Sequence, residues 1–409
     1  MDARFLPSFP LDLSYPLLFG ALLVAGLLGG EAARHLRLPR IIGYVLVGFA
    51  LAPVAQAMRL GPLLEEARIF VDIALGLVLF ELGRRVDLDW LRRDWTLAAA
   101  GAAESAVTFA LVFAALDWLG LAPLPAALGA AIAMATSPAV VLLVAQDEKA
   151  QGQVTERALA LVALNSLVAA VVVTMLTASV HYEARLDLTV AVLHPLWLFA
   201  GSLAIGGLFA AAARRLATLV ERSPEAHFTL LAGLVVAAVG LAQALKLPVI
   251  LALLAFGLLA RNDGERHALL AVDLGRGSRL FYVVLFVITG ASLPVESLFT
   301  AGAGALAYAA ARAIGKLVGV VAFAPWGGVR PRQALALGAT LLPMSSLALL
   351  LQHDVSRLYP GFGQELTAIV LGAVIVMELA GPVAVQWGLR FAGDAEPRPV
   401  EPLAAAAGR

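Results

Sequence analysis

Apolar residues dominate the chain in runs of about 20, and short polar segments with most of the charged residues separate these runs. A helix of that length crosses a hydrocarbon core of about 30 Å. The pattern therefore predicts an all-α polytopic membrane protein with about 13 transmembrane helices. We place these spans at residues 14–34, 38–56, 65–85, 95–119, 124–146, 154–180, 190–216, 227–244, 247–260, 278–296, 298–323, 331–352 and 364–390.

The fifth and twelfth predicted spans are each interrupted near the middle by hydroxyl residues and a proline. The interruptions are Ala135-Thr136-Ser137-Pro138 and Leu342-Pro343-Met344-Ser345-Ser346. Proline removes a backbone donor and clashes with the preceding turn, so we expect each span to unwind there. The breaks lie an odd number of spans apart, which predicts inverted repeats with two crossing discontinuous helices. Such paired breaks indicate the binding site of a transporter.

Broken helices also need compensating charge, because half-helix amino ends present a positive dipole and carboxyl ends a negative one. We expect a buried cationic side chain near the carboxyl ends and a carboxylate near the amino ends. The hydroxyls of Thr136, Ser137, Ser345 and Ser346 are candidate ligands for a dehydrated alkali cation. Hydrogen bonding back to the preceding turn is the alternative role for such hydroxyls, and it stays open.

Four charged residues lie deep inside predicted spans: Glu104, Arg312, Lys316 and Glu378. A charge at the centre of a membrane helix costs about 2.5–3.5 kcal/mol on insertion scales, so each requires an explanation. One interpretation is a proton- or cation-coupled site, in which a carboxylate binds the two ions in turn. The other is structural, with Glu104 neutralising Arg312 or Lys316 across the core. Both interpretations stay open.

Composition excludes several other classes of protein. Of the 409 residues, 61% are hydrophobic and only 14% are charged, whereas soluble domains carry about 25% charged residues. The absence of cysteine excludes disulfides and thiolate metal sites. The formal net charge is zero, which gives no indication of nucleic-acid binding. We find no catalytic, transition-metal or nucleotide motif, and we therefore expect neither an enzyme nor a cofactor.

The positive charges predict the orientation. Most of the 29 lysine and arginine residues fall in one alternate set of loops, which the positive-inside rule assigns to the cytoplasm. The amino terminus is then expected outside and the carboxyl terminus inside, in a bacterial inner (plasma) membrane. Residues 391–409 are rich in proline and alanine, and we predict a short disordered cytoplasmic tail there.

Four segments, taken in chain order, carry a family resemblance. They are LPRIIGYVLVG at residues 38–48, LFELGRRVD at 79–87, ATSP at 135–138 and RAIGK at 312–316. With these, nearly the whole chain resembles the cation:proton antiporter superfamily, which includes the sodium/proton exchanger transmembrane domain and Kef-type relatives.

The resemblance implies a sodium/proton antiporter-like fold in a single transmembrane domain, residues 1–390. A mobile core of residues 95–180 and 298–390 would move like an elevator past a scaffold of residues 14–85 and 190–296. The scaffold would form a homodimer.

One departure from the family pattern concerns the sixth span. The family usually has an Asn-Asp or Asp-Asp pair there, and the matching positions are Asn165 and Ser166. Serine cannot ionise in the relevant pH range, so either Glu104 supplies the missing charge or Lys316 carries the proton. The residues expected to bind ion or proton are Thr136, Ser137, Asn165, Ser166, Glu104 and Lys316. Those expected to support the helix breaks are Pro138, Pro343, Ser345, Ser346 and Arg312.

The sequence thus leads to a first hypothesis and two rivals. The first is a secondary active antiporter that exchanges a monovalent cation, Na⁺ or K⁺, for protons across the lipid bilayer. The second is a carrier of the same fold that has lost proton coupling and takes an anion or a neutral solute. The third is a transport-dead relative that acts as a sensor or as a subunit of a larger complex.

Overall fold

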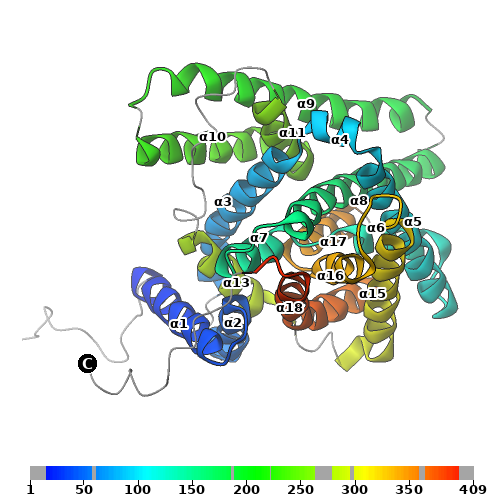
Figure 1. Ribbon diagram of the computed structural model, residues 1–409, viewed down its shortest axis with the longest axis horizontal. Coiled ribbons are helices and arrows are strands. Elements are labelled where there is room, and N and C mark those ends of the chain that lie inside the picture. Colours follow the sequence, from blue (N-terminus) through cyan, green and yellow to red (C-terminus); the bar gives the residue numbers. More distant parts are fainter. Residues whose placement is uncertain are drawn as a thin grey trace, which may run out of the picture.

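The protein is described by a computed structural model for residues 15–57, 61–185, 188–221, 223–262, 279–294, 299–358 and 364–395. The described residues form helices joined by short connections, and no strand occurs among them (Figure 1). This result confirms the predicted all-α class.

The helices pack in two groups, within which the most extensive helix pairings occur. The first group consists of α1 (Tyr15–His35), α2 (Arg40–Ala57), α3 (Gly61–Arg85), α9 (Leu188–Ala217), α10 (Pro224–Ala244), α11 (Val249–Asn262) and α13 (Arg279–Ser292). The second group consists of α5 (Trp95–Trp118), α6 (Pro123–Met134), α7 (Pro138–Asp147), α8 (Gln153–Arg185), α15 (Ala303–Phe323), α16 (Pro331–Thr340), α17 (Ser346–Leu358) and α18 (Gln364–Ala392). The short helix α4 (Leu88–Arg93) joins α3 to α5. In Figure 1, α9 and α10 run along the upper edge, while α15, α16 and α18 lie to the lower right.

Glycine pairs allow helices of the first group to pack with their backbones in contact. A Cβ atom added to Gly48 of α2 would lie 2.3 Å from the carbonyl oxygen of Val287 on α13. One added to Gly257 of α11 would lie 2.1 Å from the carbonyl oxygen of Phe80 on α3. Small residues at such crossings are typical of membrane helices, where van der Waals packing replaces the hydrophobic driving force.

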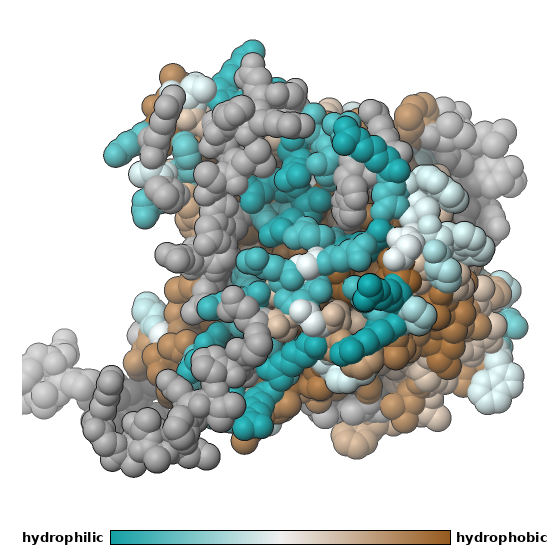
Figure 2. Space-filling model, viewed as in Figure 1, coloured by the Kyte–Doolittle hydropathy of each residue, from teal (hydrophilic) through white to brown (hydrophobic). Residues whose placement is uncertain are grey.

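The helices agree with a multi-pass membrane protein. Seven helical segments of the described chain, counting α6 and α7 as one, are long and apolar enough to cross a membrane, and three shorter apolar helices accompany them. The exact count of thirteen spans therefore stays a prediction. Figure 2 shows hydrophilic residues gathered across the middle of one face and hydrophobic residues along its lower right edge. Large apolar side chains such as Leu28, Trp118 and Leu208 are exposed, as expected for contact with lipid.

The first residues of the predicted tail contact the amino end of α8. Helix α18 continues to Ala392, and the carboxylate of Asp394 accepts hydrogen bonds from the Thr155 amide at 2.8 Å and its hydroxyl at 2.9 Å. The Asp394 carbonyl also accepts a bond from the Gln151 amide. The carboxylate thus accepts hydrogen bonds at the amino end of α8, where negative charge is favourable. These bonds attach the segment after α18 to α8. The rest of the predicted tail, residues 396–409, lies outside the described residues.

Candidate functional site

The two predicted helix breaks are present, and they meet. Helix α6 ends at Met134 and α7 begins at Pro138, while α16 ends at Thr340 and α17 begins at Ser346. The Ser137 amide donates to the Pro343 carbonyl at 2.9 Å, and the Ser137 and Ser345 hydroxyls bond to each other. The two extended segments therefore cross in contact inside the second helix group.

Arg312 of α15 joins the carboxyl ends of both broken helices. Its guanidinium donates to the carbonyls of Ala133 at 2.9 Å and Ala135 at 2.7 Å, where α6 ends. It also donates to the carbonyls of Leu342 at 2.5 Å and Pro343 at 3.1 Å, beyond the end of α16. The side chain is completely buried. A single cation thus satisfies backbone acceptors that lost their helical partners at both breaks.

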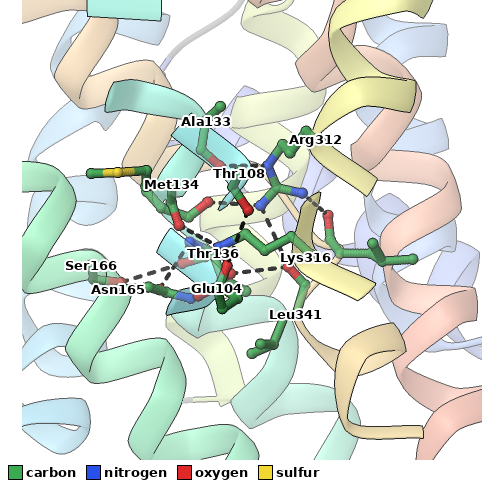
Figure 3. A network of polar contacts seen from close by, with 12 residues as sticks. Glu104, Thr108, Ala133, Met134, Thr136, Asn165, Ser166, Arg312, Lys316 and Leu341 are labelled. Atoms are coloured by element: carbon green, nitrogen blue, oxygen red, sulfur yellow. Dashed lines mark hydrogen bonds and ion pairs between the residues drawn. The ribbon is translucent and has the colours of Figure 1, made fainter. Parts of the chain in front are cut away.

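Lys316, one turn further along α15, lies against the same end of α6. Its ammonium donates to the Met134 carbonyl and forms an ion pair with Glu104 of α5 (Figure 3). Both side chains of the pair are fully buried. The sequence left Arg312 and Lys316 open as partners of Glu104, and in the structure the carboxylate pairs with Lys316.

A close approach of α5 and α15 brings this pair together. A Cβ atom at Gly315 would lie 2.6 Å from Thr108 Cα, and one at Gly319 would lie 2.4 Å from Glu104 Cα. The spacing of four residues places both glycines on the face of α15 that touches α5. The small-residue pattern thus sets the distance across which Lys316 reaches Glu104.

We expect the Gly319→Ala substitution to destabilise the protein, because its methyl group would push α15 away from the Glu104 backbone. Overpacking of this kind costs about 1–3 kcal/mol. Thermal melting of the purified protein in detergent measures the effect. The matched control is Gly233→Ala on α10, where nothing lies within 4 Å of the added atom and alanine favours the helix. An unchanged melting temperature for Gly319→Ala would contradict the close-packing argument.

Helix α8 contributes a hydrogen-bonded polar group next to the first break. The side-chain amide nitrogen of Asn165 donates to the Thr136 hydroxyl at 3.0 Å, and Asn165 Oδ1 accepts from the backbone amide of Thr136 at 3.3 Å. The Thr136 hydroxyl then donates to the Leu341 carbonyl at 3.0 Å, and the Ser166 hydroxyl lies 3.5 Å from the Thr136 carbonyl. The Thr136 hydroxyl therefore bonds across the crossing, which excludes back-bonding to its own turn in this structure.

Figure 3 shows these groups in one network, in which Glu104, Thr136, Asn165, Ser166, Arg312 and Lys316 converge on the crossing. The structure thus brings together all the residues predicted to bind ion or proton, since Ser137 belongs to the same break. It also places the predicted break-supporting residues there: Pro138, Pro343, Ser345, Ser346 and Arg312. Their functional roles stay predictions.

Glu378 of α18 was recognised in the sequence as a buried charge but was left out of the predicted site. It is fully buried, and the Ser345 side chain lies beside its carboxyl group. One turn further on, a Cβ atom at Gly381 would lie 2.7 Å from Pro343 Cα, so this face of α18 is turned toward the second break. The sequence offered one indication of its position: the fifth and twelfth predicted spans correspond in the inverted repeat, so the thirteenth span, which carries Glu378, corresponds to the sixth, which carries Asn165 and Ser166.

Ionic contacts join the carboxyl end of α7 to α2 and α18. Arg40 of α2 pairs with Asp147 at the end of α7 at 2.6 Å, which joins the two helix groups. Glu148 accepts from Arg390 and from Gln386 of α18, each at 2.7 Å. Within the described part of the chain, no cluster of His, Asp and Glu side chains could hold a metal ion.

Comparisons with known proteins show the family and the fold of the chain. The family model described as "Sodium/hydrogen exchanger, transmembrane" matches residues 19–390. A structure of the sodium proton antiporter MjNhaP1 from Methanocaldococcus jannaschii at pH 8 is similar, with a TM-score of 0.67 and 16% identity. The match covers 93% of this chain and 98% of that one. An electron-microscopy structure of MjNhaP1 gives a TM-score of 0.65 at 17% identity and covers 94% and 100% of the two chains. No curated protein matches this sequence.

Proposed function

Because the chain belongs to the sodium/hydrogen exchanger transmembrane family, whose model matches residues 19–390, we propose that it exchanges a monovalent cation for protons across a membrane. The family consists of transporters and not of enzymes. The finer assignment is that the cation is Na⁺ or K⁺. Hydroxyl, amide and carboxylate oxygens lie at the crossing, and hard cations prefer oxygen ligands.

The observation that carries the proposal is the fully buried Glu104–Lys316 ion pair beside two broken helices. A dehydrated cation that binds the Glu104 carboxylate can replace the ammonium group there. Lys316 without its counter-charge is then a buried cation, which is strongly disfavoured unless it loses its proton. Cation binding and proton release are thereby coupled, and the net charge of the pair is conserved in the exchange.

Neutral ligands complete the proposed site. Ser166 and Asn165 on α8 and Thr136 and Ser137 at the first break supply oxygen atoms without a charge of their own. The proposal assigns the charge exchange to Glu104 and Lys316, since Ser166 stands where the family usually has an aspartate. The bonds between Thr136 and Asn165 would have to open for a cation to enter.

The movement that exposes the site in turn to each side is proposed to be of the elevator type. The second helix group would be the moving core, and the first group the scaffold that forms a homodimer. Support comes from the denser packing within each group than between them. We also propose a bacterial inner membrane, with the amino terminus outside and the carboxyl terminus in the cytoplasm.

Exchange in proteoliposomes tests the proposal. We expect Na⁺ or K⁺ to drive proton movement by the wild-type protein, and Lys316→Ala and Glu104→Gln to abolish it. Glu225→Gln, an exposed acid on α10, is the matched control that keeps wild-type exchange. Normal exchange by both site variants would refute the residue assignment. A wild-type protein that moves no protons with any alkali cation would refute the function and favour the uncoupled carrier.

A further inference from the structure

Glu378 is a buried acid that takes no part in the Glu104–Lys316 ion pair. Four acidic or basic side chains (Asp, Glu, Lys or Arg) of the described residues are completely inaccessible to solvent, namely Glu104, Arg312, Lys316 and Glu378. The first three lie together at the carboxyl ends of α6 and α16. Neither carboxylate oxygen of Glu378 has well-formed hydrogen-bond geometry with a described residue, and the Ser345 side chain is the polar neighbour beside it. An ionised carboxylate in that position needs a positively charged ligand.

The surroundings of Glu378 belong to the opposite side of the crossing. The adjacent Ser345 directly precedes the amino end of α17, and its hydroxyl bonds to Ser137, which directly precedes α7. The Ser346 hydroxyl is buried and also lacks a partner among the described residues. The Ser137 and Ser345 hydroxyls and the Glu378 carboxyl group thus lie together where the amino ends of the two half-helices meet, and Ser346 is the first residue of α17 at this end. The amino end of a helix favours negative charge.

Among the described residues, the charged groups considered on neighbouring helices are remote from Glu378 along the helix or are engaged by other partners. Arg390 of α18 is about three turns away and is engaged by Glu148. On α17, His353 and Asp354 lie about two turns beyond Ser346, and both have partners of their own. Arg40 of α2 pairs with Asp147 at the far end of α7, and Arg332 of α16 bonds to the Phe391 carbonyl. Arg312 and Lys316 on α15 are committed to the backbone carbonyls and to Glu104.

Burial without a counter-charge restricts the states of this carboxyl group. An ionised, unpaired carboxylate in a dry interior is too costly to be populated. In this conformation Glu378 must therefore be neutral, and a bound proton or a bound monovalent cation each achieves that. These are the two ions that the proposed function exchanges.

We propose that Glu378 is a second ion-binding carboxylate, which holds a proton in one part of the transport cycle and a monovalent cation in the other. The hydroxyls of Ser137, Ser345 and Ser346 are its neutral co-ligands. This inference rests on the proposed function and extends it to the amino ends of α7 and α17. When the cation binds, the carboxyl proton leaves to solvent and the site stays neutral, so the step needs no further reactant.

Proton release from the purified full-length protein tests this assignment. The protein is placed in weakly buffered detergent solution, NaCl or KCl is added, and choline chloride sets the baseline. We expect the wild-type protein to release protons on addition of the alkali cation. We expect Glu378→Gln to release about twofold fewer protons, because one of two proton-carrying groups is lost. Glu378→Asp should retain the release, and Glu365→Gln, an exposed acid on the same helix, is the matched control.

The possible outcomes separate this inference from the proposed function. A folded Glu378→Gln protein that releases protons like the wild type, and exchanges normally in proteoliposomes, overturns the second site and leaves the antiport standing. A wild-type protein with neither release nor exchange overturns both. If Glu378→Gln does not fold, Ser346→Ala decides. A rise of at least threefold in the cation concentration for half-maximal release supports the site, and an unchanged concentration overturns it.

Discussion

The Arg312→Met variant is expected to lose its folded state rather than only its transport activity. The guanidinium donates to five backbone carbonyls at the two breaks, those of Ala133, Ala135, Leu341, Leu342 and Pro343. Methionine fills a similar volume but donates to none of them. Three of the five would be orphaned, because the Leu341 and Pro343 carbonyls keep the Thr136 hydroxyl and the Ser137 amide as donors. Each orphaned buried acceptor costs about 1–3 kcal/mol, and the total approaches the 5–15 kcal/mol by which proteins are typically stable.

Expression yield, size-exclusion profile and melting temperature in detergent measure the loss. Arg312→Lys should recover only part of it, because a single ammonium lacks the planar fork of donors that reaches both carboxyl ends. Arg215→Met, at an exposed arginine on α9, controls for the change in charge. A monodisperse Arg312→Met protein with the melting temperature of the wild type would show that the carbonyls do not depend on this side chain.

The Glu104→Leu variant is expected to be strongly destabilised, and a second substitution is expected to rescue it. Removing one partner of a buried ion pair leaves the other charge uncompensated, which costs about 3–5 kcal/mol. Replacing both partners by apolar residues is often close to neutral. The double variant Glu104→Leu/Lys316→Met should therefore melt well above Glu104→Leu alone, although the Met134 carbonyl loses a donor in both the double and the Lys316→Met proteins.

A double-mutant cycle of melting temperatures checks this coupling, with the Lys316→Met single variant completing the cycle. The double variant also distinguishes structure from function. Recovered stability without recovered exchange indicates that the pair acts in transport. A double variant no more stable than Glu104→Leu would contradict the direct pairing of the two residues.

The helix breaks were predictable because their cause is local. Pro138 and Pro343 interrupt apolar runs, and proline acts on the turn that precedes it wherever the chain is placed. The structure confirms both interruptions. The contact between the breaks is not local, because the bond from Ser137 to Pro343 joins segments far apart in the chain. The sequence supplied only the symmetry argument for that contact.

Side-chain partners were less predictable than the breaks. The sequence placed Arg312 and Lys316 on one helix face but left both open as partners of Glu104. The choice depends on the separation of α5 and α15, which Gly315 and Gly319 set through tertiary packing. Glu378 was missed as a site residue for a related reason. Its distinguishing property is the lack of a partner, and a lack of partners is visible only once the neighbouring helices are in place.

The position of Asp394 has a practical consequence for protein engineering. Its carboxylate accepts bonds from both the amide and the hydroxyl of Thr155, and its carbonyl accepts one from Gln151. If the chain were truncated after Arg390 and joined there to an affinity tag or a reporter protein, these acceptors would be lost. The first turn of α8, the helix that carries Asn165 and Ser166, would then be exposed. A fusion joined beyond residue 395 keeps the hydrogen bonds of Asp394 to Thr155 and Gln151.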